Sequence, residues 1–198
     1  MIKAILFDSG GVIVDQRLWF ERLNKIFRPK NKKKFWREIN IEAIPLCKNL
    51  ISEKVFWKRI AKLNKKDIKK IPKNLWRLGY ENLTKVKHDV LAIAQKLKKK
   101  YKIGIVSNSI AYHEKINKKR GTYNLFDAVI LSHKVGLTKN NKKIFFLAAK
   151  KLKVKPKECI FIDDVKDFVD VAKSVGMAGI VFKNSKQLKS DFKKFIKF

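Results

Sequence analysis

The chain has 198 residues and is strongly basic: 49 Lys and Arg stand against 17 Asp and Glu, a formal net charge of +32. Hydrophobic residues make up 45% of the chain, which excludes a disordered protein and allows one domain with a modest insertion. The basic residues are spread along the whole chain. We therefore interpret most of them as solvated helix surface, although such a charge also attracts nucleic acid, acidic lipid and phosphorylated metabolites.

The sequence gives no indication of a zinc site, a secretory signal or a membrane span. Cys47 and Cys159 are far apart, and no Cys/His spacing typical of zinc binding is present. The N-terminal segment has no charged region followed by a long apolar one, and the chain has no run of about 18 apolar residues. We therefore expect a cytoplasmic protein in a reducing compartment.

The chain opens with an apolar run, residues 2–7, that predicts a buried strand. Residues 15–84 then show the periodicity of amphipathic helices and no convincing strand. The predicted helical segments cover residues 16–27, 32–40, 52–64 and 74–83. All four tryptophans lie in this region, and we expect them to form its small core: Trp19, Trp36, Trp57 and Trp76. This pattern predicts a helical subdomain inserted after the first strand.

Apolar runs and helical segments alternate after residue 84. The runs predict strands over residues 102–107, 128–132, 159–162 and 179–182. Helical segments precede three of these strands, over residues 88–100, 142–152 and 167–176. Parallel strands need crossovers of this length, so the alternation predicts an α/β fold with a doubly wound parallel sheet and an inserted α-helical cap. The predicted core is residues 1–14 and 85–198, and the predicted cap is residues 15–84.

The last segment, residues 185–198, also has a helical period. Its apolar face is predicted to consist of Leu188, Phe192, Phe195 and Ile196. We expect this face to dock on the sheet, and a helix lying on a membrane surface is the alternative.

Chemically capable side chains follow successive predicted strands. They are Asp8 after the first strand, Ser107 and Asn108 after the second, Lys139 after the third, and Asp163 and Asp164 after the fourth. Each alone has a simpler explanation as a helix cap, a solvated lysine or a turn. Open parallel sheets, however, bind ligands beyond the carboxyl ends of their strands, so these groups should converge. Carboxylates suit Mg²⁺, an aspartate can attack phosphorus, and a hydroxyl and a lysine can hold phosphoryl oxygens. The pattern therefore favours phosphoryl transfer.

The motifs resemble those of the haloacid dehalogenase superfamily of mostly Mg²⁺-dependent phosphatases. FDSGGVIVD (residues 7–15), VSNS (106–109), the Lys139 region and FIDD (161–164) look like its four motifs. The chain is similar to the branch with a helical cap after the first strand, and within it to the group of α-D-glucose-1-phosphatase-type members. The resemblance implies a Mg²⁺-dependent phosphomonoesterase that acts on a small phosphorylated metabolite, such as a sugar phosphate, through an aspartyl-phosphate.

The same resemblance assigns roles to individual residues. Asp8 is the expected nucleophile, and Ser107 and Lys139 are the other expected catalytic residues. The expected phosphate-binding residues are Ser9, Gly10, Ser107, Asn108 and Lys139, and the expected metal ligands are Asp8, the Gly10 carbonyl, Asp163 and Asp164. His113 is a secondary candidate whose alternative is a structural role.

Three positions depart from the family pattern. Gly10 replaces the usual acid/base aspartate, Asn140 replaces a proline, and Phe168 replaces an asparagine. The first departure keeps two alternatives open: a catalytically weak or degenerate member that binds a phosphorylated ligand or nucleic acid, and a haloacid dehalogenase that uses Asp8. We expect a small phosphorylated substrate, no specific nucleic-acid partner, and a monomer or homodimer.

Overall fold

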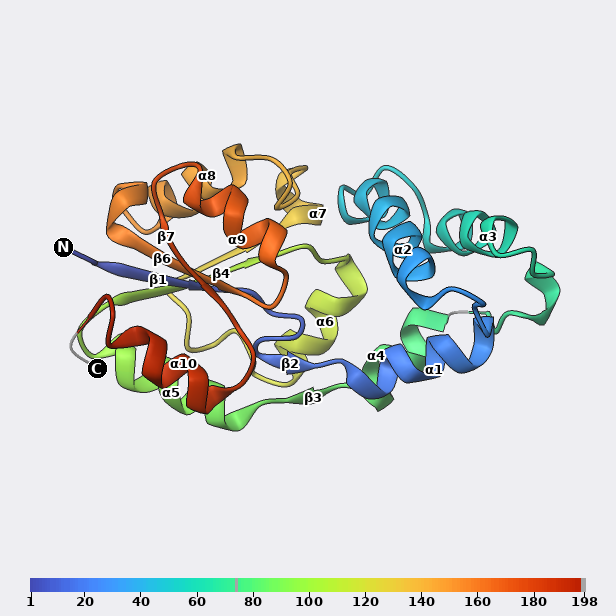
Figure 1. Cartoon of the computed structure of the whole chain (residues 1–198), viewed down its shortest axis with the longest axis horizontal. Helices are drawn as coiled ribbons and strands as arrows, with labels where there is room; N and C mark the ends of the chain where they lie inside the picture. The colour runs from blue at the N-terminus through green and yellow to red at the C-terminus, as the bar shows by residue number, and fades with distance from the viewer. Residues whose placement is uncertain (74, 197–198) are drawn as a thin grey trace.

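A five-stranded parallel sheet lies at the centre of the part of the chain that the structure, a computed structural model, describes (Figure 1). That part is residues 1–73 and 75–196, without the side chain of Leu78. The strand order is β5-β4-β1-β6-β7. The strands are β1 (Ala4–Phe7), β4 (Lys102–Ser107), β5 (Ala128–Leu131), β6 (Cys159–Asp163) and β7 (Ala178–Val181). Each of the five predicted strands is therefore confirmed. Since β1 is central, the loop after it lies between the loops that follow β4 and β6.

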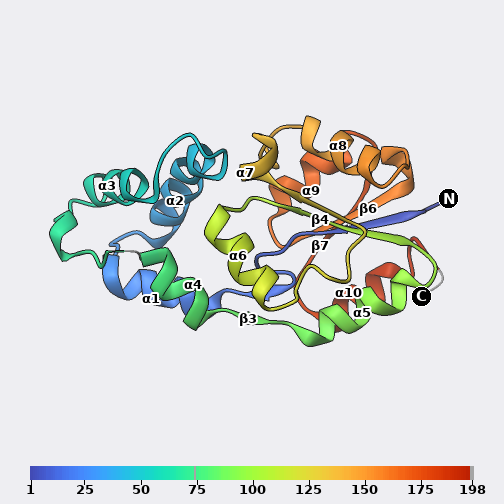
Figure 2. The same ribbon diagram turned by 180° about the vertical axis from the view of Figure 1, so that it is seen from behind.

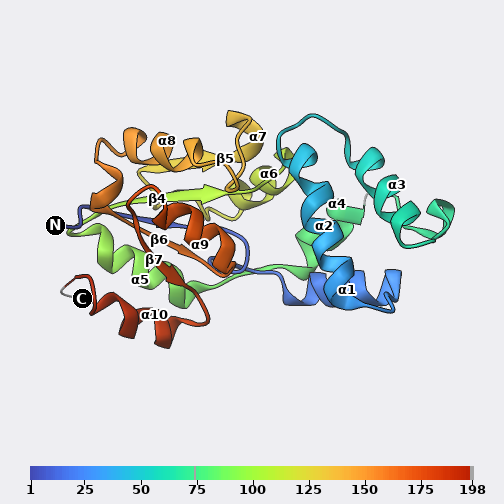
Figure 3. The same ribbon diagram turned by 45° about the horizontal axis from the view of Figure 1, so that its top comes forward.

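Helices cover both faces of this sheet (Figures 1 and 3). They are α5 (His88–Lys98) and α10 (Ser185–Phe192) on one face and α8 (Lys143–Lys151) and α9 (Lys166–Lys173) on the other. The alternation of side chains along a strand explains the two layers. Ile5 and Phe7 pack into the hydrophobic cluster beneath α5 and α10, whereas Ala4 and Leu6 pack into the cluster beneath α8 and α9. The predicted doubly wound α/β fold is thus confirmed.

A short antiparallel ribbon leads from the sheet to the inserted helices and back. Its strands are β2 (Val14–Asp15) and β3 (Lys85–Val86). Between them lie α1 (Arg17–Phe27), α2 (Lys32–Cys47), α3 (Glu53–Leu63), the short 3₁₀ helix η1 (Ile68–Lys70) and α4 (Leu75–Leu83). Side chains of Asn31 and Ser52 accept hydrogen bonds from backbone N–H groups at the starts of α2 and α3, which fixes where these helices begin.

The inserted helices have a hydrophobic cluster of their own. Trp19 and Trp57 are buried in it, and Trp36 and Trp76 pack against it, as predicted. The helix predicted over residues 32–40 is longer than expected, because α2 continues to Cys47 with Pro45 inside it. The predicted fourth segment began at residue 74, which lies outside the described residues. We keep residues 15–84 as the proposed extent of the cap.

The C-terminal helix differs in part from the prediction. Leu188 and Phe192 are fully buried and Ile196 is partly buried, but Phe195 is 39% exposed because α10 ends before it. The helix packs against α5, and its buried side chains join the cluster on that face of the sheet. Residues 197–198 of the predicted helix lie outside the described part. Within the described residues, no helix is both long and apolar enough to cross a membrane.

Two short helices hold the insertion against the core. The sequence pattern predicted neither of them. They are α6 (Ala111–Lys119) and α7 (Ser132–Val135). Arg120 at the end of α6 donates hydrogen bonds to the carbonyl oxygens of Glu81, in the last turn of α4, and of Thr84, directly after that helix. The end of α2 lies against α7 (Figures 1 and 2). The inserted helices are therefore held beside the carboxyl edge of the sheet.

Candidate active site

Three charged side chains meet at the carboxyl edge of the sheet. Asp8 follows β1, Asp163 ends β6, and Lys139 lies in the loop after α7. The Nζ atom of Lys139 is 2.9 Å from Asp8 Oδ1 and 2.6 Å from Asp163 Oδ2. Each of these residues is at most 5% exposed. The sequence prediction that these residues converge is therefore borne out in the geometry, and we call them the ion triad.

Burial dominates the electrostatics of the ion triad. Burial disfavours the ionised carboxyl of Asp8, and the charge of Lys139 opposes this effect. The negative charges of Asp163 and Asp164 reinforce it, and the net result raises the pKa of Asp8 to about 7. Burial also disfavours the ammonium form of Lys139, but the charges of Asp163 and Asp8 outweigh it and raise the pKa of Lys139 above its ordinary value. Lys139 is thus a fixed cation, and Asp8 needs a further positive charge to stay fully ionised.

The acidic groups of the site fit a divalent cation. Among the described residues, Asp8, Asp163 and Asp164 offer carboxylate oxygens within 4.8 Å of one another. Three carboxylates and one ammonium leave two negative charges, and hard carboxylate oxygens are the ligands that Mg²⁺ prefers. Asp164 lies at the exposed rim, where partial burial and the charge of Asp163 raise its pKa. The predicted ligation by the Gly10 carbonyl, in the neighbouring loop, stays a prediction.

The predicted phosphate-binding residues surround the ion triad. Ser107 ends β4 and is buried, and the side-chain oxygen of Asn108 accepts a hydrogen bond of 2.9 Å from the backbone N–H of Lys139. Ser9 is buried, and its N–H donates to Asp8 Oδ1 at 2.7 Å, which orients the carboxylate. These contacts bring the loops after β1, β4 and β5 to one point.

Gly11, in the loop that follows Asp8, has no room for a side chain. Its φ of +78° is a left-handed conformation that favours glycine, and the carboxylate of Asp164 packs directly on it. A Cβ atom on Gly11 would lie 2.2 Å from Asp164 Oδ2. On the other side, Lys87 from the ribbon donates a hydrogen bond to the Gly11 carbonyl. The absence of a side chain at position 11 therefore leaves the space that the Asp164 carboxylate occupies.

We expect Gly11→Ala to lower Mg²⁺ affinity much more than an ordinary glycine substitution. The left-handed backbone costs on the order of 1–3 kcal/mol for a non-glycine residue, and the new methyl group also displaces Asp164. Gly136→Ala is the matched control, because Gly136 has a φ of +67° but nothing within 4 Å of its Cβ position. Calorimetry with Mg²⁺ and urea unfolding separate the two effects. Equal Mg²⁺ affinities in the two variants would contradict this explanation of Gly11.

The space above Gly10 is filled by another residue. A Cβ atom on Gly10 would lie 2.9 Å from Oε1 and 3.0 Å from Nε2 of Gln16, which precedes α1. A neutral amide therefore lies where a side chain at position 10 would begin. An amide can hold a hydrogen-bonding group in place, but it does not transfer protons as a carboxylate does.

The structure argues against a proton-transfer role for His113, the secondary candidate. Its ring stacks on Tyr80 with 3.8 Å between centroids and meets the edge of Trp76. Burial, helped by the nearby charge of His133, lowers the pKa of His113 to about 3. His113 is thus a neutral packing residue between α6 and α4, which was the alternative left open by the sequence.

Phe168 has a contact that the sequence pattern did not predict. The Nζ atom of Lys139 lies 4.6 Å from the centroid of the Phe168 ring, the geometry of a cation–π interaction. An aromatic ring thus supports the lysine from the α9 side. The loop that carries Asn140 still brings Lys139 to the ion triad without a proline.

Sequence reasoning missed the side chains that other elements bring to the site. Cys47 is the last residue of α2, and its thiol lies beside Ser132 and near the charge of Lys139. Burial raises the pKa of this thiol to about 11. Gln16 and Lys87 come from the ends of the inserted segment. No local pattern marks Cys47 and Lys87, because both reach the site through the packing of distant segments. Gln16 reaches Gly10 because the loop after β1 folds back on itself, with the N–H of Gly11 donating to the Val14 carbonyl.

Two comparisons by sequence identify relatives of this chain. Residues 2–176 match the family model described as haloacid dehalogenase-like hydrolase. A glyceraldehyde 3-phosphate phosphatase of Methanopyrus kandleri is 36% identical over 69 residues, which are 34% of this chain and 29% of that protein, so the match spans less than a third of the relative. YhcW of Bacillus subtilis, which carries a provisional phosphatase name, is 27% identical over 93% of this chain and 84% of its own length.

A comparison with solved structures agrees with the fold described above. A haloacid dehalogenase family enzyme of Bacteroides thetaiotaomicron, solved in complex with magnesium and inorganic phosphate, superimposes with a TM-score of 0.68. The match covers 92% of this chain and 95% of that enzyme at 23% identity. At this level of identity the likeness shows the fold alone.

Proposed function

This chain belongs to the haloacid dehalogenase-like hydrolase family, and on that premise we propose that it is a Mg²⁺-dependent phosphomonoesterase. Its substrate would be a small phosphorylated metabolite, and the reaction would pass through an aspartyl-phosphate on Asp8. The single observation that carries this proposal is the ion triad, in which Lys139 lies between Asp8 and Asp163 at 2.9 and 2.6 Å. A lysine beside Asp8 would keep a carboxylate nucleophile ionised in either reaction, so it does not separate a phosphatase from a dehalogenase. The three carboxylates that suit Mg²⁺ favour phosphoryl transfer, because displacing a halide from carbon needs no metal ion.

Different residues of the chain would have different roles in phosphoryl transfer. Asp8, held by the N–H of Ser9, attacks the phosphorus atom and the leaving group departs with its oxygen. Lys139 and Ser107 hold phosphoryl oxygens, where charge accumulates. Water then hydrolyses the aspartyl-phosphate and regenerates Asp8. The inserted helices beside the sheet would exclude bulk water and choose the substrate.

Mg²⁺ would be held by Asp8, Asp163 and Asp164, with the Gly10 carbonyl as a further ligand. When bound, it would neutralise charge on the phosphoryl group and supply the positive charge that Asp8 needs to stay ionised.

The decisive experiment is a screen of phosphorylated metabolites for phosphate release with Mg²⁺ and with EDTA. Hydrolysis that requires Mg²⁺ supports the proposal. Binding of a phosphorylated ligand without turnover would favour the degenerate-member alternative, and halide release from 2-haloacids would favour the dehalogenase alternative.

Gly10 leads to a prediction about leaving groups. Without a carboxylate at position 10, wild-type protein should favour phosphates whose leaving groups depart without protonation, such as sugar 1-phosphates, aryl phosphates and acyl phosphates. Gly10→Asp should raise kcat/KM on alkyl phosphates by up to about 10²-fold, the low end of what a positioned acid contributes. The flexible Gln16 side chain must move to admit the new carboxylate.

Gly10→Asn is the matched control, because it has the same size and cannot donate a proton in this way. The measurement is kcat/KM against leaving-group pKa for the three proteins. A flat dependence in wild type would contradict this account of Gly10. Because His113 is neutral and buried, Asp164 would then be the residue to test as the proton donor.

A further inference from the structure

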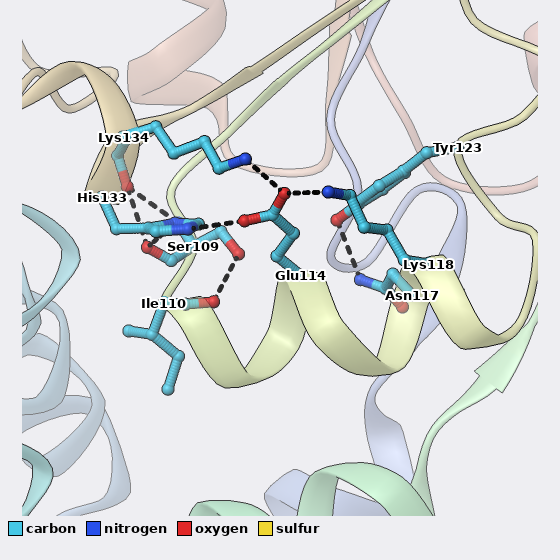
Figure 4. A network of polar contacts seen from close by, with 9 residues as sticks. Ser109, Ile110, Glu114, Asn117, Lys118, Tyr123, His133 and Lys134 are labelled. Carbon is cyan, nitrogen blue, oxygen red and sulfur yellow. Dashed lines mark hydrogen bonds and ion pairs between the residues drawn. The ribbon is translucent and has the colours of Figure 1, made fainter.

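A polar network next to the contact between Asn108 and Lys139 joins the loop after β4 to α7 (Figure 4). The N–H of Ser109 donates to Ser132 Oγ at 2.9 Å, and Ser132 Oγ donates back to the Ser109 carbonyl at 3.1 Å. The same carbonyl faces Nδ1 of His133 at 3.2 Å. Both backbone polar groups of Ser109 are therefore bound to α7.

Glu114 of α6 closes the network from the other side. It lies 3.0 Å from His133 Nε2, and it accepts contacts from Lys118 at 2.9 Å and Lys134 at 2.6 Å (Figure 4). Burial would raise the pKa of Glu114, but hydrogen bonds from Lys134, Lys118 and His133 outweigh burial and lower it to about 2. Glu114 is therefore a carboxylate, which can only accept hydrogen bonds.

The two ring nitrogens of His133 thus face two acceptors, the Ser109 carbonyl and the Glu114 carboxylate. A neutral imidazole has one N–H, so it would turn a lone pair towards one of these oxygens at 3.0–3.2 Å. A ring with both nitrogens protonated satisfies both contacts. The other groups that face it are Lys134 on its own helix, and Lys118 and the neutral His113 on α6.

We propose that His133, held as an imidazolium by Glu114, is a positioning residue that fixes the loop of Ser107 and Asn108 for phosphate binding. The inference rests on the proposed function, in which these two residues bind the phosphoryl group. Ser109 immediately follows Asn108, whose side chain contacts the backbone of Lys139 at 2.9 Å. The loop is therefore held to the segment 132–139 at two points, and His133 shares one of them, the backbone of Ser109, with Ser132.

The protonation of the ring is tested by ¹⁵N NMR on the full wild-type chain at about pH 7, with His133→Gln identifying the signals. Both ring nitrogens of His133 should carry a proton. A single protonated nitrogen would overturn the proposal. This readout needs neither substrate nor turnover.

The positioning role is tested by calorimetry with inorganic phosphate in the presence of Mg²⁺. His133→Gln and Glu114→Gln should each weaken phosphate binding roughly tenfold, the size of one lost charge-assisted hydrogen bond, and the double variant should lose no more than either. Lys115→Gln is the control, because it removes one positive charge from an exposed position on α6 outside the network. Its affinity should match wild type.

Two results would overturn the positioning role while leaving the proposed function intact. In the first, the His133 and Glu114 variants bind phosphate as tightly as active wild type. In the second, Lys115→Gln loses as much phosphate affinity as they do, which would make the effect one of charge alone. Failure of the proposed function is recognised separately, because wild type would then release no phosphate from any metabolite. The NMR result still decides the protonation in that case and if Glu114→Gln does not fold.

Discussion

Asp8→Asn is expected to abolish Mg²⁺-dependent phosphate release while leaving the fold intact. Asparagine keeps the shape of the side chain but removes the charge that attacks phosphorus, so kcat should fall by a factor on the order of 10³ or more. Phosphate release under single-turnover conditions measures the loss. A variant as active as wild type would remove Asp8 from the mechanism.

The stability of the same variant provides its control. Because the pKa of Asp8 is raised to about 7 in the folded protein, ionising Asp8 opposes folding between its ordinary range and neutral pH. A neutral asparagine avoids this cost, so in EDTA at about pH 7 the variant should be no less stable than wild type. Urea unfolding tests this point, and a large destabilisation would mean that lost activity reflects a damaged fold.

The fold was predictable because its signals are local. Each strand of the sheet is a short apolar run, and each main crossover helix repeats its apolar residues every three or four positions. The strands then dictate the site, since Asp8 and Asp163 are attached to neighbouring parallel strands that end at the same edge. Lys139 was predictable by its place after β5, although its burial between two carboxylates was not.

The parts that were not predicted depend on contacts between distant segments. No apolar periodicity marks the short helices α6 and α7, because their buried residues are mostly polar: His113, Glu114, Ile116, Asn117 and Ser132. Lys87 reaches the carbonyl of Gly11, 76 positions earlier in the chain, because the ribbon returns the chain to that loop. The His133–Glu114 contact likewise joins residues 19 positions apart that belong to different helices. Such polar pairs have no sequence signature until the tertiary structure is known.

Lys139→Met is expected to impair both activity and stability, because it leaves Asp8 and Asp163 buried without their cation. Breaking a buried ion pair on one side costs about 3–5 kcal/mol of unfolding free energy, and removing a preorganised phosphoryl-binding charge costs on the order of 10²–10³-fold in kcat. Lys142→Met, an exposed lysine in the same loop, is the control and should change neither. Urea unfolding and phosphate release measure the two effects.

The dependence on pH and Mg²⁺ identifies the cause of the Lys139→Met destabilisation. Because the pKa of Asp8 is already raised to about 7, protonation of Asp8 relieves part of the uncompensated charge in acid. The destabilisation in EDTA should therefore be larger at about pH 8 than at about pH 5. Mg²⁺ should recover more stability in the variant than in wild type, because the cation supplies the charge that the lysine no longer provides. A loss of stability that is independent of pH and Mg²⁺ would point to lost packing against Phe168 instead of lost charge.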